Sequence, residues 1–240
     1  MTVPTSKLKH LFLAGLFIAA PIVTHADVIV SYGFDGASSL SEMLEPSSVA
    51  NNVAASSIAA NNVTVVPQHG FASDPDNQLA AKADITTSSL SVSSTLSNET
   101  YFSFTLTPDA GQQITFDSLT FTAQGGGSSV YRAFYVFSSA TGFEAADVLE
   151  SGIQEGEATD TLNSTGETLY TITFSSLVVT SETEFRFYID SDSTSRTVIF
   201  DDVTVNGTVS AVPEASTTAL VIGVLAIMAT LIRRRAGSLK

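Results

Sequence analysis

The feature that most constrains the fold of this 240-residue chain is a two-residue alternation of apolar and polar side chains. In the clearest segment, 101–107, Phe102, Phe104 and Leu106 fall on one face. The segment 184–189 repeats the pattern. Successive side chains of a strand point to opposite faces, so these segments predict strands that bury one face.

Similar segments recur from residue 27 to residue 210, and no convincing amphipathic helix lies between them. Turns rich in Gly, Asp, Ser and Thr separate the segments, which predicts an all-β domain of two packed antiparallel sheets, a jelly-roll-like β-sandwich. The stretch 47–97 is rich in Ser, Ala, Asn and Thr and predicts long loops with short strands, serving either as a binding surface or as a polar spacer. The expected strands are 28–32, 63–66, 90–92, 101–107, 114–123, 130–137, 169–174, 184–189 and 197–209.

The C-terminal segment, 211–240, combines a short motif, an uncharged span over 216–232 and a basic tail over 233–240. As a helix the span covers roughly 25 Å, close to the bilayer core of about 30 Å, which predicts a transmembrane helix. Basic residues favour the cytoplasmic side, so the motif is expected outside. The motif is Val212-Pro213-Glu214-Ala215, and the residues that fix the topology are Arg233, Arg234 and Arg235.

The N-terminal segment, 1–26, has the three parts of a secretory signal peptide. Lys7 and Lys9 precede an apolar run over 11–20, which is too short for a lasting membrane helix. Small residues then predict that signal peptidase cuts between Ala26 and Asp27, so the chain is expected to be exported.

The C-terminal combination of motif, span and arginines resembles the PEP-CTERM sorting signal of Gram-negative bacteria. In that family, exosortase recognises the motif and helix and processes the protein for delivery to the surface. Pro213 and Glu214 match the motif, whereas Ala215 stands where the family usually has a second proline. The resemblance implies export across the inner membrane, transient anchoring there, and a final place at the cell surface or outside the cell.

The charge of the segment between the two targeting regions is strongly negative. Residues 27–214 hold all 24 acidic residues and four basic ones, a formal charge of about −20. Such a domain repels nucleic acid, and it suits divalent cations, neutral polymers or simple solubility. There is no cysteine, so disulfides do not contribute to stability. Arg132 and Arg186 are interpreted as forming ion pairs with the surplus carboxylates rather than binding an acidic sugar.

The segments 101–109, 116–121 and 199–207 resemble strands of carbohydrate-binding-module-type jelly rolls. In many such modules an aspartate of the last strand helps to hold a structural calcium ion, and Asp201 is the matching position. In a regular strand Asp201 would share the core face with Val203, unless a β-bulge at Asp201–Asp202 turned it outward. Asp35, in the turn after the first strand, is its expected companion. Calcium and plain hydrogen bonding both remain open interpretations of the two aspartates.

No catalytic signature is present that we can defend. His69 is the single histidine of residues 27–214, and no carboxylate pair lies in a recognisable glycosidase context. The sequence therefore favours a non-enzymatic surface or matrix protein that binds extracellular polysaccharide. A secreted glycan hydrolase and a structural matrix protein without a ligand are the alternatives.

Overall fold

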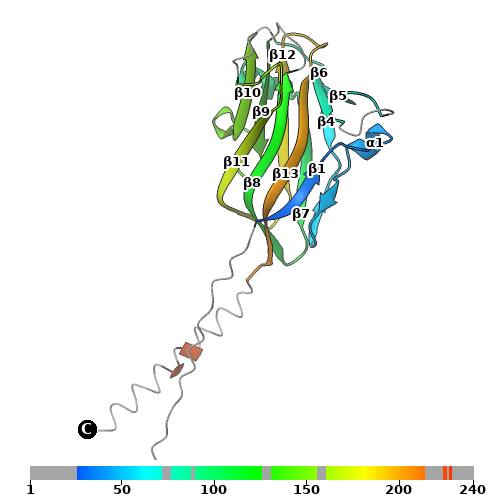
Figure 1. Cartoon of the computed structure of the whole chain (residues 1–240). Coiled ribbons are helices and arrows are strands. Elements are labelled where there is room, and N and C mark those ends of the chain that lie inside the picture. The colour runs from blue at the N-terminus through cyan, green and yellow to red at the C-terminus, as the bar shows by residue number, and fades with distance from the viewer. Residues whose placement is uncertain are drawn as a thin grey trace, which may run out of the picture.

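The protein folds as a sandwich of two β-sheets (Figure 1), in a computed structural model that describes residues 26–71, 77–87, 90–125, 131–155, 161–213, 224–225 and 227–228. In these residues, sheet A has seven strands in the order β11-β8-β13-β1-β2, with β6 beside β13 and β5 beside β6. Sheet B has six strands in the order β10-β9-β12-β7-β3, with β4 beside β7. Every strand pair described is antiparallel, so the predicted antiparallel β-sandwich is confirmed.

The strands differ greatly in length. Sheet A contains β1 (Asp27–Tyr32), β2 (Ser48–Val49), β5 (Val63–Pro67), β6 (Leu79–Ala83), β8 (Gln112–Gly125), β11 (Thr168–Val179) and β13 (Val198–Ala211). Sheet B contains β3 (Val53–Ala55), β4 (Ala59–Asn61), β7 (Tyr101–Pro108), β9 (Tyr131–Ser138), β10 (Glu150–Glu155) and β12 (Thr183–Ser191). The helices described are α1 (Leu40–Met43), α2 (Val92–Asn98) and the 3-10 turn η1 (Ala145–Asp147).

The main core lies between the sheets and is built largely from phenylalanine. The Phe187 ring stacks on Phe102 at 4.8 Å between centroids and meets Phe121 and Phe200 edge to face. All four side chains are fully buried. Burial of one such ring contributes about 1.5–3 kcal/mol, and aromatic pairing adds to it. The faces predicted by the alternation in 101–107 and 184–189 are therefore the core faces.

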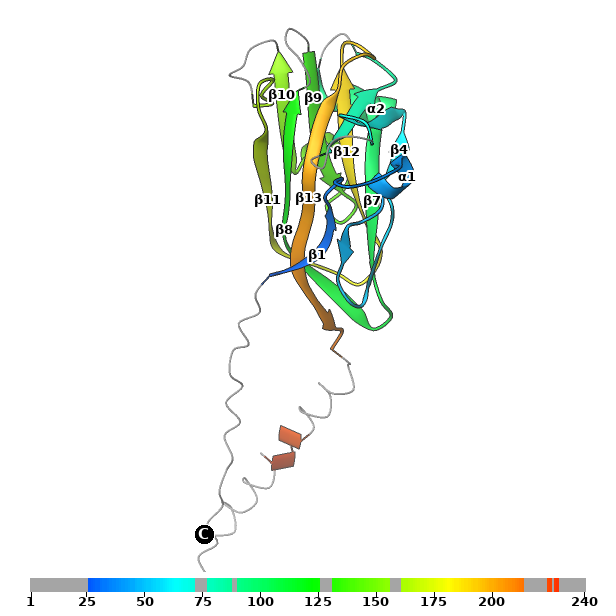
Figure 2. The same ribbon diagram turned by 45° about the vertical axis from the view of Figure 1, so that its right-hand side comes forward.

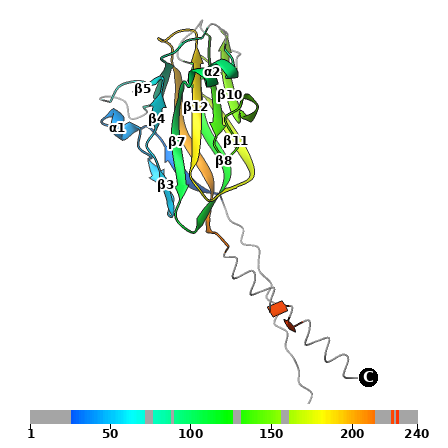
Figure 3. The ribbon, with the colours of Figure 1, turned by 180° about the vertical axis from the view of Figure 1, so that it is seen from behind.

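A second, smaller core lies on the outer face of sheet B, where α2 covers the sheet (Figure 3). Val92 and Leu96 of α2 pack against Tyr135 and Tyr188. The predicted strand at 90–92 is wrong, because Ser91 caps a helix that begins at the next residue. The sequence of α2 is rich in Ser and Thr, which are weak helix formers, so packing on the sheet stabilises the helix more than propensity does.

Five strands were not predicted individually: β2, β3, β4, β6 and β10. The first four lie in 47–97, where short strands were expected but only 63–66 and 90–92 were given bounds. The remaining expected strands are present within a few residues of their bounds. The segment of β6, Leu-Ala-Ala-Lys-Ala, lacks β-branched and aromatic side chains, and its pairing with β5 and β13 holds it in place. The strand β10 contains Gly152 and no regular alternation. Its pairing with β9 at six positions forms it.

The two ends of the domain lie together. Asp27, at the start of β1, is opposite Gly207 near the end of β13, so the start of one strand and the end of the other lie at the same end of the sandwich (Figure 1). After β13, the Val212 N–H donates to the Gly111 carbonyl at 2.9 Å, and Val212 is 37% exposed. A link on either side of the domain would therefore hold it at this end.

Most of the predicted targeting segments lies outside the described residues. This holds for residues 1–25 of the signal peptide, for Glu214 and Ala215 of the motif, and for Arg233, Arg234 and Arg235. Of the predicted span 216–232, the described residues are Val224, Leu225, Ile227 and Met228, which are helical and exposed. Among the described residues, no helix has the length and apolar character needed to cross a bilayer.

The aromatic core makes a direct prediction about stability. Phe187→Ala is expected to lower the free energy of unfolding by about 3–5 kcal/mol, because it leaves a cavity among rings that cannot all move in. Urea unfolding followed by circular dichroism measures the change. The control is Val178→Ala, which removes a side chain that is 47% exposed, and a similar loss in both variants would contradict the assignment of the core.

Candidate functional site

A β-bulge at Asp201–Asp202 in β13 decides where the Asp201 side chain lies. The register against β8 shifts between Asp201 and Thr204, and Asp202 has a φ of 50°. Phe200 and Val203 are both in the core although they lie three residues apart. The expectation that Asp201 shares the core face with Val203 is therefore wrong, and the alternative of an outward turn through a bulge is confirmed.

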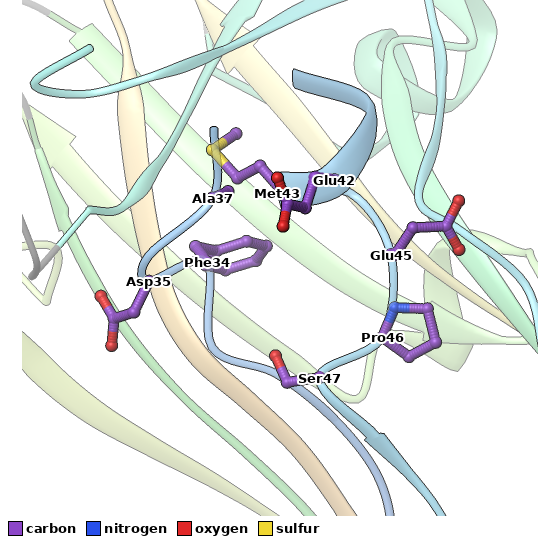
Figure 4. A pocket seen from close by; sticks show the side chains of 8 residues that line it. All are labelled: Phe34, Asp35, Ala37, Glu42, Met43, Glu45, Pro46 and Ser47. Atoms are coloured by element: carbon purple, nitrogen blue, oxygen red, sulfur yellow. The ribbon is translucent and has the colours of Figure 1, made fainter. Parts of the chain in front are cut away.

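The bulge occupies the place where β13 changes its neighbour. Along one edge, β13 pairs first with β6, through Val198–Phe200, and then with β1, from Val203 onward. Asp201 and Asp202 lie between the two pairings. Immediately after β1, the turn over 33–36 carries Asp35 toward this gap, beside the strand β13 (Figure 4).

Several negative charges act on the Asp201 carboxyl. Burial and the charges of Asp202, Asp35 and Glu167 raise its pKa to about 7. One contact has the opposite effect: the backbone N–H of Asp202 donates to Oδ1 of Asp201 at 2.8 Å and favours the ionised form. Glu167 in turn accepts hydrogen bonds from the Gln78 amide and from the Thr122 hydroxyl. The pairing of β1 with β13 thus brings Asp35 close enough for its charge to act on Asp201, while their joint role in a metal site stays a prediction.

A calcium ion would need more oxygens than this arrangement supplies. Calcium takes six to eight oxygen ligands, and in the described part of the chain no group of three His, Cys, Asp or Glu side chains is placed to hold a metal ion. Asp201 and Asp35 therefore do not fit a preformed ligand sphere. The calcium site stays a prediction.

A pocket of about 260 Å³ lies next to Asp35, between the turn at 33–36 and α1 (Figure 4). Its acidic side chains do not converge: Asp35 and Glu45 point away from one another on opposite sides of Phe34. The third, Glu42, accepts two hydrogen bonds from Ser38, which lower the pKa of its carboxyl. This is not the arrangement of two carboxylates across a cleft that a glycosidase needs.

The outer face of sheet B carries a cluster of aromatic rings around Arg186. The guanidinium carbon lies 4.4 Å from the centre of the Tyr101 ring and 4.2 Å from that of Phe143. Arg186 also pairs with Glu184 at 2.8 Å and donates to the Tyr188 hydroxyl at 3.3 Å. Arg186 and Glu184 both remain 23% exposed. The expected ion pair of Arg186 with a carboxylate is confirmed. Arg132 is fully buried instead and donates to the Thr197 carbonyl at 2.7 Å, so an acidic sugar does not reach it.

Two opposing influences act on the protonation of this cluster. Burial alone would lower the pKa of Arg186, but the hydrogen bonds to Glu184 and Tyr188 raise it above its usual value. The guanidinium therefore stays charged at any pH at which the protein is folded. Burial also raises the pKa of Tyr101, so the hydroxyl stays neutral and can donate a hydrogen bond.

The loop after β9 holds Phe143 against the guanidinium. Gly142 has a φ of 122°, and a Cβ at this position would lie 2.3 Å from Oδ2 of Asp147. The same oxygen accepts a hydrogen bond from the Glu144 N–H. Only glycine suits this conformation, so the loop is fixed close to the sheet. The sequence showed no sign of this contact, because Phe143 stands outside any alternating segment.

Asp190, a buried carboxylate of β12, was also not found from the sequence. It is 2% exposed and accepts hydrogen bonds from Thr87, from the Ser91 N–H at 3.1 Å and from Thr95 at 2.9 Å. Two of these donors belong to the start and the body of α2. The bonds therefore fasten the helix to sheet B, and Asp190 is a structural residue.

No described constellation has the form of a catalytic centre. His69 is exposed, and its backbone N–H donates to the Asn77 side chain at 3.4 Å. The candidate sites of the described residues are therefore the aspartates at the bulge of sheet A and the Arg186 cluster on sheet B.

Comparison with known proteins gives a weak likeness of structure. No protein-family model matches the chain, and no curated protein does. Among solved structures, it is similar to the CBM22-1 xylan-binding domain of Paenibacillus barcinonensis Xyn10C, with a TM-score of 0.37 and 9% identity over 76% of this chain and 95% of that one.

Two further structures are similar at the same level. One is TmCBM61 in complex with β-1,4-galactotriose, with a TM-score of 0.32 and 13% identity over 62% of this chain and 85% of that one. The other is the K3 cleaved adhesin domain of Lys-gingipain from Porphyromonas gingivalis, with a TM-score of 0.31 and 12% identity over 60% and 91%. Carbohydrate-binding modules thus occur among the similar structures, but scores this low carry no argument about ligand or activity.

The raised pKa of Asp201 predicts how stability depends on pH. The folded state holds the Asp201 proton more tightly than the unfolded state, so the contribution of Asp201 to stability is full below about pH 4 and is lost as the pH rises through about 7. Asp201→Asn removes this loss. Because water reaches part of the side chain, we expect the variant to be about 1–2 kcal/mol more stable at pH 8 and equal to the wild type at pH 4.

Thermal unfolding at a series of pH values provides the measurement, and Asp109→Asn, in the exposed turn after β7, is the control. If Asp201→Asn were more stable than the wild type at pH 4 as well as at pH 8, the raised pKa of Asp201 would not be the cause of the gain in stability. Calcium added to the same proteins separates the two interpretations of the aspartates. A bound ion raises the melting temperature of the wild type and leaves that of Asp201→Asn unchanged.

Proposed function

We propose that this protein is exported, displayed at the cell surface through its C-terminal sorting segment, and binds neutral extracellular polysaccharide without catalysing a reaction. The partly exposed cluster of Tyr101, Phe143 and Arg186 on sheet B carries the proposal. Sugar C–H faces pack on aromatic rings, while sugar hydroxyls accept from a guanidinium and donate to a carboxylate. Arg186 and Glu184 supply both kinds of polar group within 2.8 Å of each other.

The charge of the domain favours a neutral ligand over an acidic one. The four basic residues of 27–214 stand against 24 acidic ones. Arg186, the cation of the cluster, is already paired with Glu184. A polyanion would gain little at this cluster and would be repelled by the rest of the surface.

The position of the domain ends supports display. Because Asp27 and Gly207 are opposite one another, a tether after Ala211 would hold the sandwich at one end. Sheet B would then stand upright from the membrane with its outer face open to the surroundings. Processing near Glu214 by an exosortase-type enzyme, with Arg233–Arg235 on the cytoplasmic side, would release or transfer the domain.

The two alternatives differ from the proposal in what they require. A glycan hydrolase needs two carboxylates across a cleft, and in the described residues the acids around the pocket face apart. A matrix protein without a ligand would not need a partly exposed ion pair among aromatic rings. Activity assays on polysaccharide extracts test the hydrolase.

Binding is tested by affinity electrophoresis through gels that contain single neutral polysaccharides. We expect retardation by at least one of them, and Arg186→Ala is expected to weaken the binding about tenfold, because it removes the group that organises both rings. The control is Lys82→Ala, which removes a cation from sheet A. Migration unaffected by every polysaccharide, or an equal loss in the control, would contradict the proposal.

Processing is tested by mass spectrometry of the protein recovered from cells. The expected mature form begins at Asp27 and ends at or close to Glu214. Recovery of a chain that still carries Lys240 would argue against processing, although it would leave binding to polysaccharide untouched.

A further inference from the structure

The outer edge of sheet A is formed by β11, a twelve-residue strand with a free side (Figure 2). One side of β11 pairs with β8. In the described part of the chain, no other hydrogen bond reaches its backbone. Leu169 is 68% exposed, and the outward side chains of Thr171 and Thr173 are exposed as well. A long strand with an unpaired edge is a template for pairing with another chain.

The other sheet edges that the structure describes are protected in ways that β11 is not. The strands β2, β3 and β4 have only two or three residues, and β5 ends in Pro67. The edge of β10 has an acidic residue at each end and is covered by Thr161 and Leu162, whose hydroxyl and N–H bond to Ile153. Short strands, prolines, charges and covering segments are the usual means of blocking edge pairing.

The sequence of β11 has none of these blocks over its first half. In a domain with 24 acidic residues, Thr168–Val179 contains no charged residue, no proline and no glycine. A bulge shifts the register between Thr173 and Leu177, and Ser176 has a φ of 57°. The bulge twists the second half of the strand. The regular, neutral and unprotected part is therefore 168–173.

We propose that this edge binds the same edge of a second copy of the chain, in antiparallel orientation and centred on Thr171. A two-fold axis through this position places Thr171 opposite itself and Leu169 opposite Thr173 of the second copy. Threonine pairs and apolar contacts across strands stabilise such an arrangement. The segment 168–173 has no carboxylate that could attract a basic partner. The equally neutral edge of a second copy therefore fits it better.

Antiparallel pairing has a consequence for the tethered state. The two copies point their Asp27 and Ala211 ends in opposite directions, while both sheet B faces turn to the same side. Copies anchored side by side in one membrane cannot adopt this geometry. The pairing therefore belongs to copies that have been released, or to copies held on two different surfaces.

Cysteine crosslinking of the full chain in detergent tests the pairing, and the chain offers a clean background because it has no cysteine. Thr171→Cys brings its two thiols together across the axis, so mild oxidation is expected to give roughly tenfold more dimer than the matched control. The control is Ser93→Cys, an exposed position on α2. Equal crosslinking of the two variants would overturn the proposal.

A charge at the axis provides the second measurement. Thr171→Lys places two like charges opposite one another and is expected to weaken the dimer about tenfold in sedimentation equilibrium, whereas Ser93→Lys leaves it unchanged. Melting temperatures show that both variants are folded. A chain that stays monomeric throughout, or a dimer that tolerates Thr171→Lys, would overturn the proposal even if polysaccharide binding were established.

Discussion

The bulge in β13 is the constraint on which the rest of sheet A depends. This strand lies at the centre of the sheet and must pair with β8 along one edge and with both β6 and β1 along the other. An uninterrupted alternation would carry Asp201 into the core together with Val203. One extra residue resets the phase, so Phe200 and Val203 both face the core and the carboxylate turns outward. The raised pKa of Asp201 is the remaining cost of this solution, because the outward position is still half-buried and also lies among other carboxylates.

The two outer faces of the sandwich differ in their charge. Sheet A presents carboxylates around the gap between β6 and β1, and their repulsion disfavours any further negative charge. Sheet B presents a cation that is already neutralised by Glu184 and enclosed by rings. A neutral ligand that offers hydroxyls and C–H groups suits the second face and gains nothing from the first. The proposed ligand class thus follows from the charge distribution of the whole domain.

The sequence predicts an element correctly where its local pattern agrees with its tertiary environment. Strands such as β7 and β12 were predictable, because every second residue is apolar and packs in the core. The helix α2 was not, since Val92 and Leu96 show a helical spacing only over two turns and the helix relies on Asp190, about a hundred positions away in sequence. The Arg186 cluster escaped notice for the same reason. Its members come from β7, β12 and a loop, and nothing in the neighbouring sequence marks Phe143 as their partner.

The free edge of β11 and the grouping of the domain ends place opposite demands on the molecule. A tether after Ala211 orients neighbouring copies in parallel, and in that state the edge of β11 has no matching partner, because antiparallel pairing needs one copy inverted. In the proposed tethered state, geometry alone would prevent self-pairing, without charges on the edge. Removal of the tether lifts this restriction and leaves the edge available. The proposed tether and the proposed pairing of β11 edges are therefore compatible, provided that release of the domain precedes assembly.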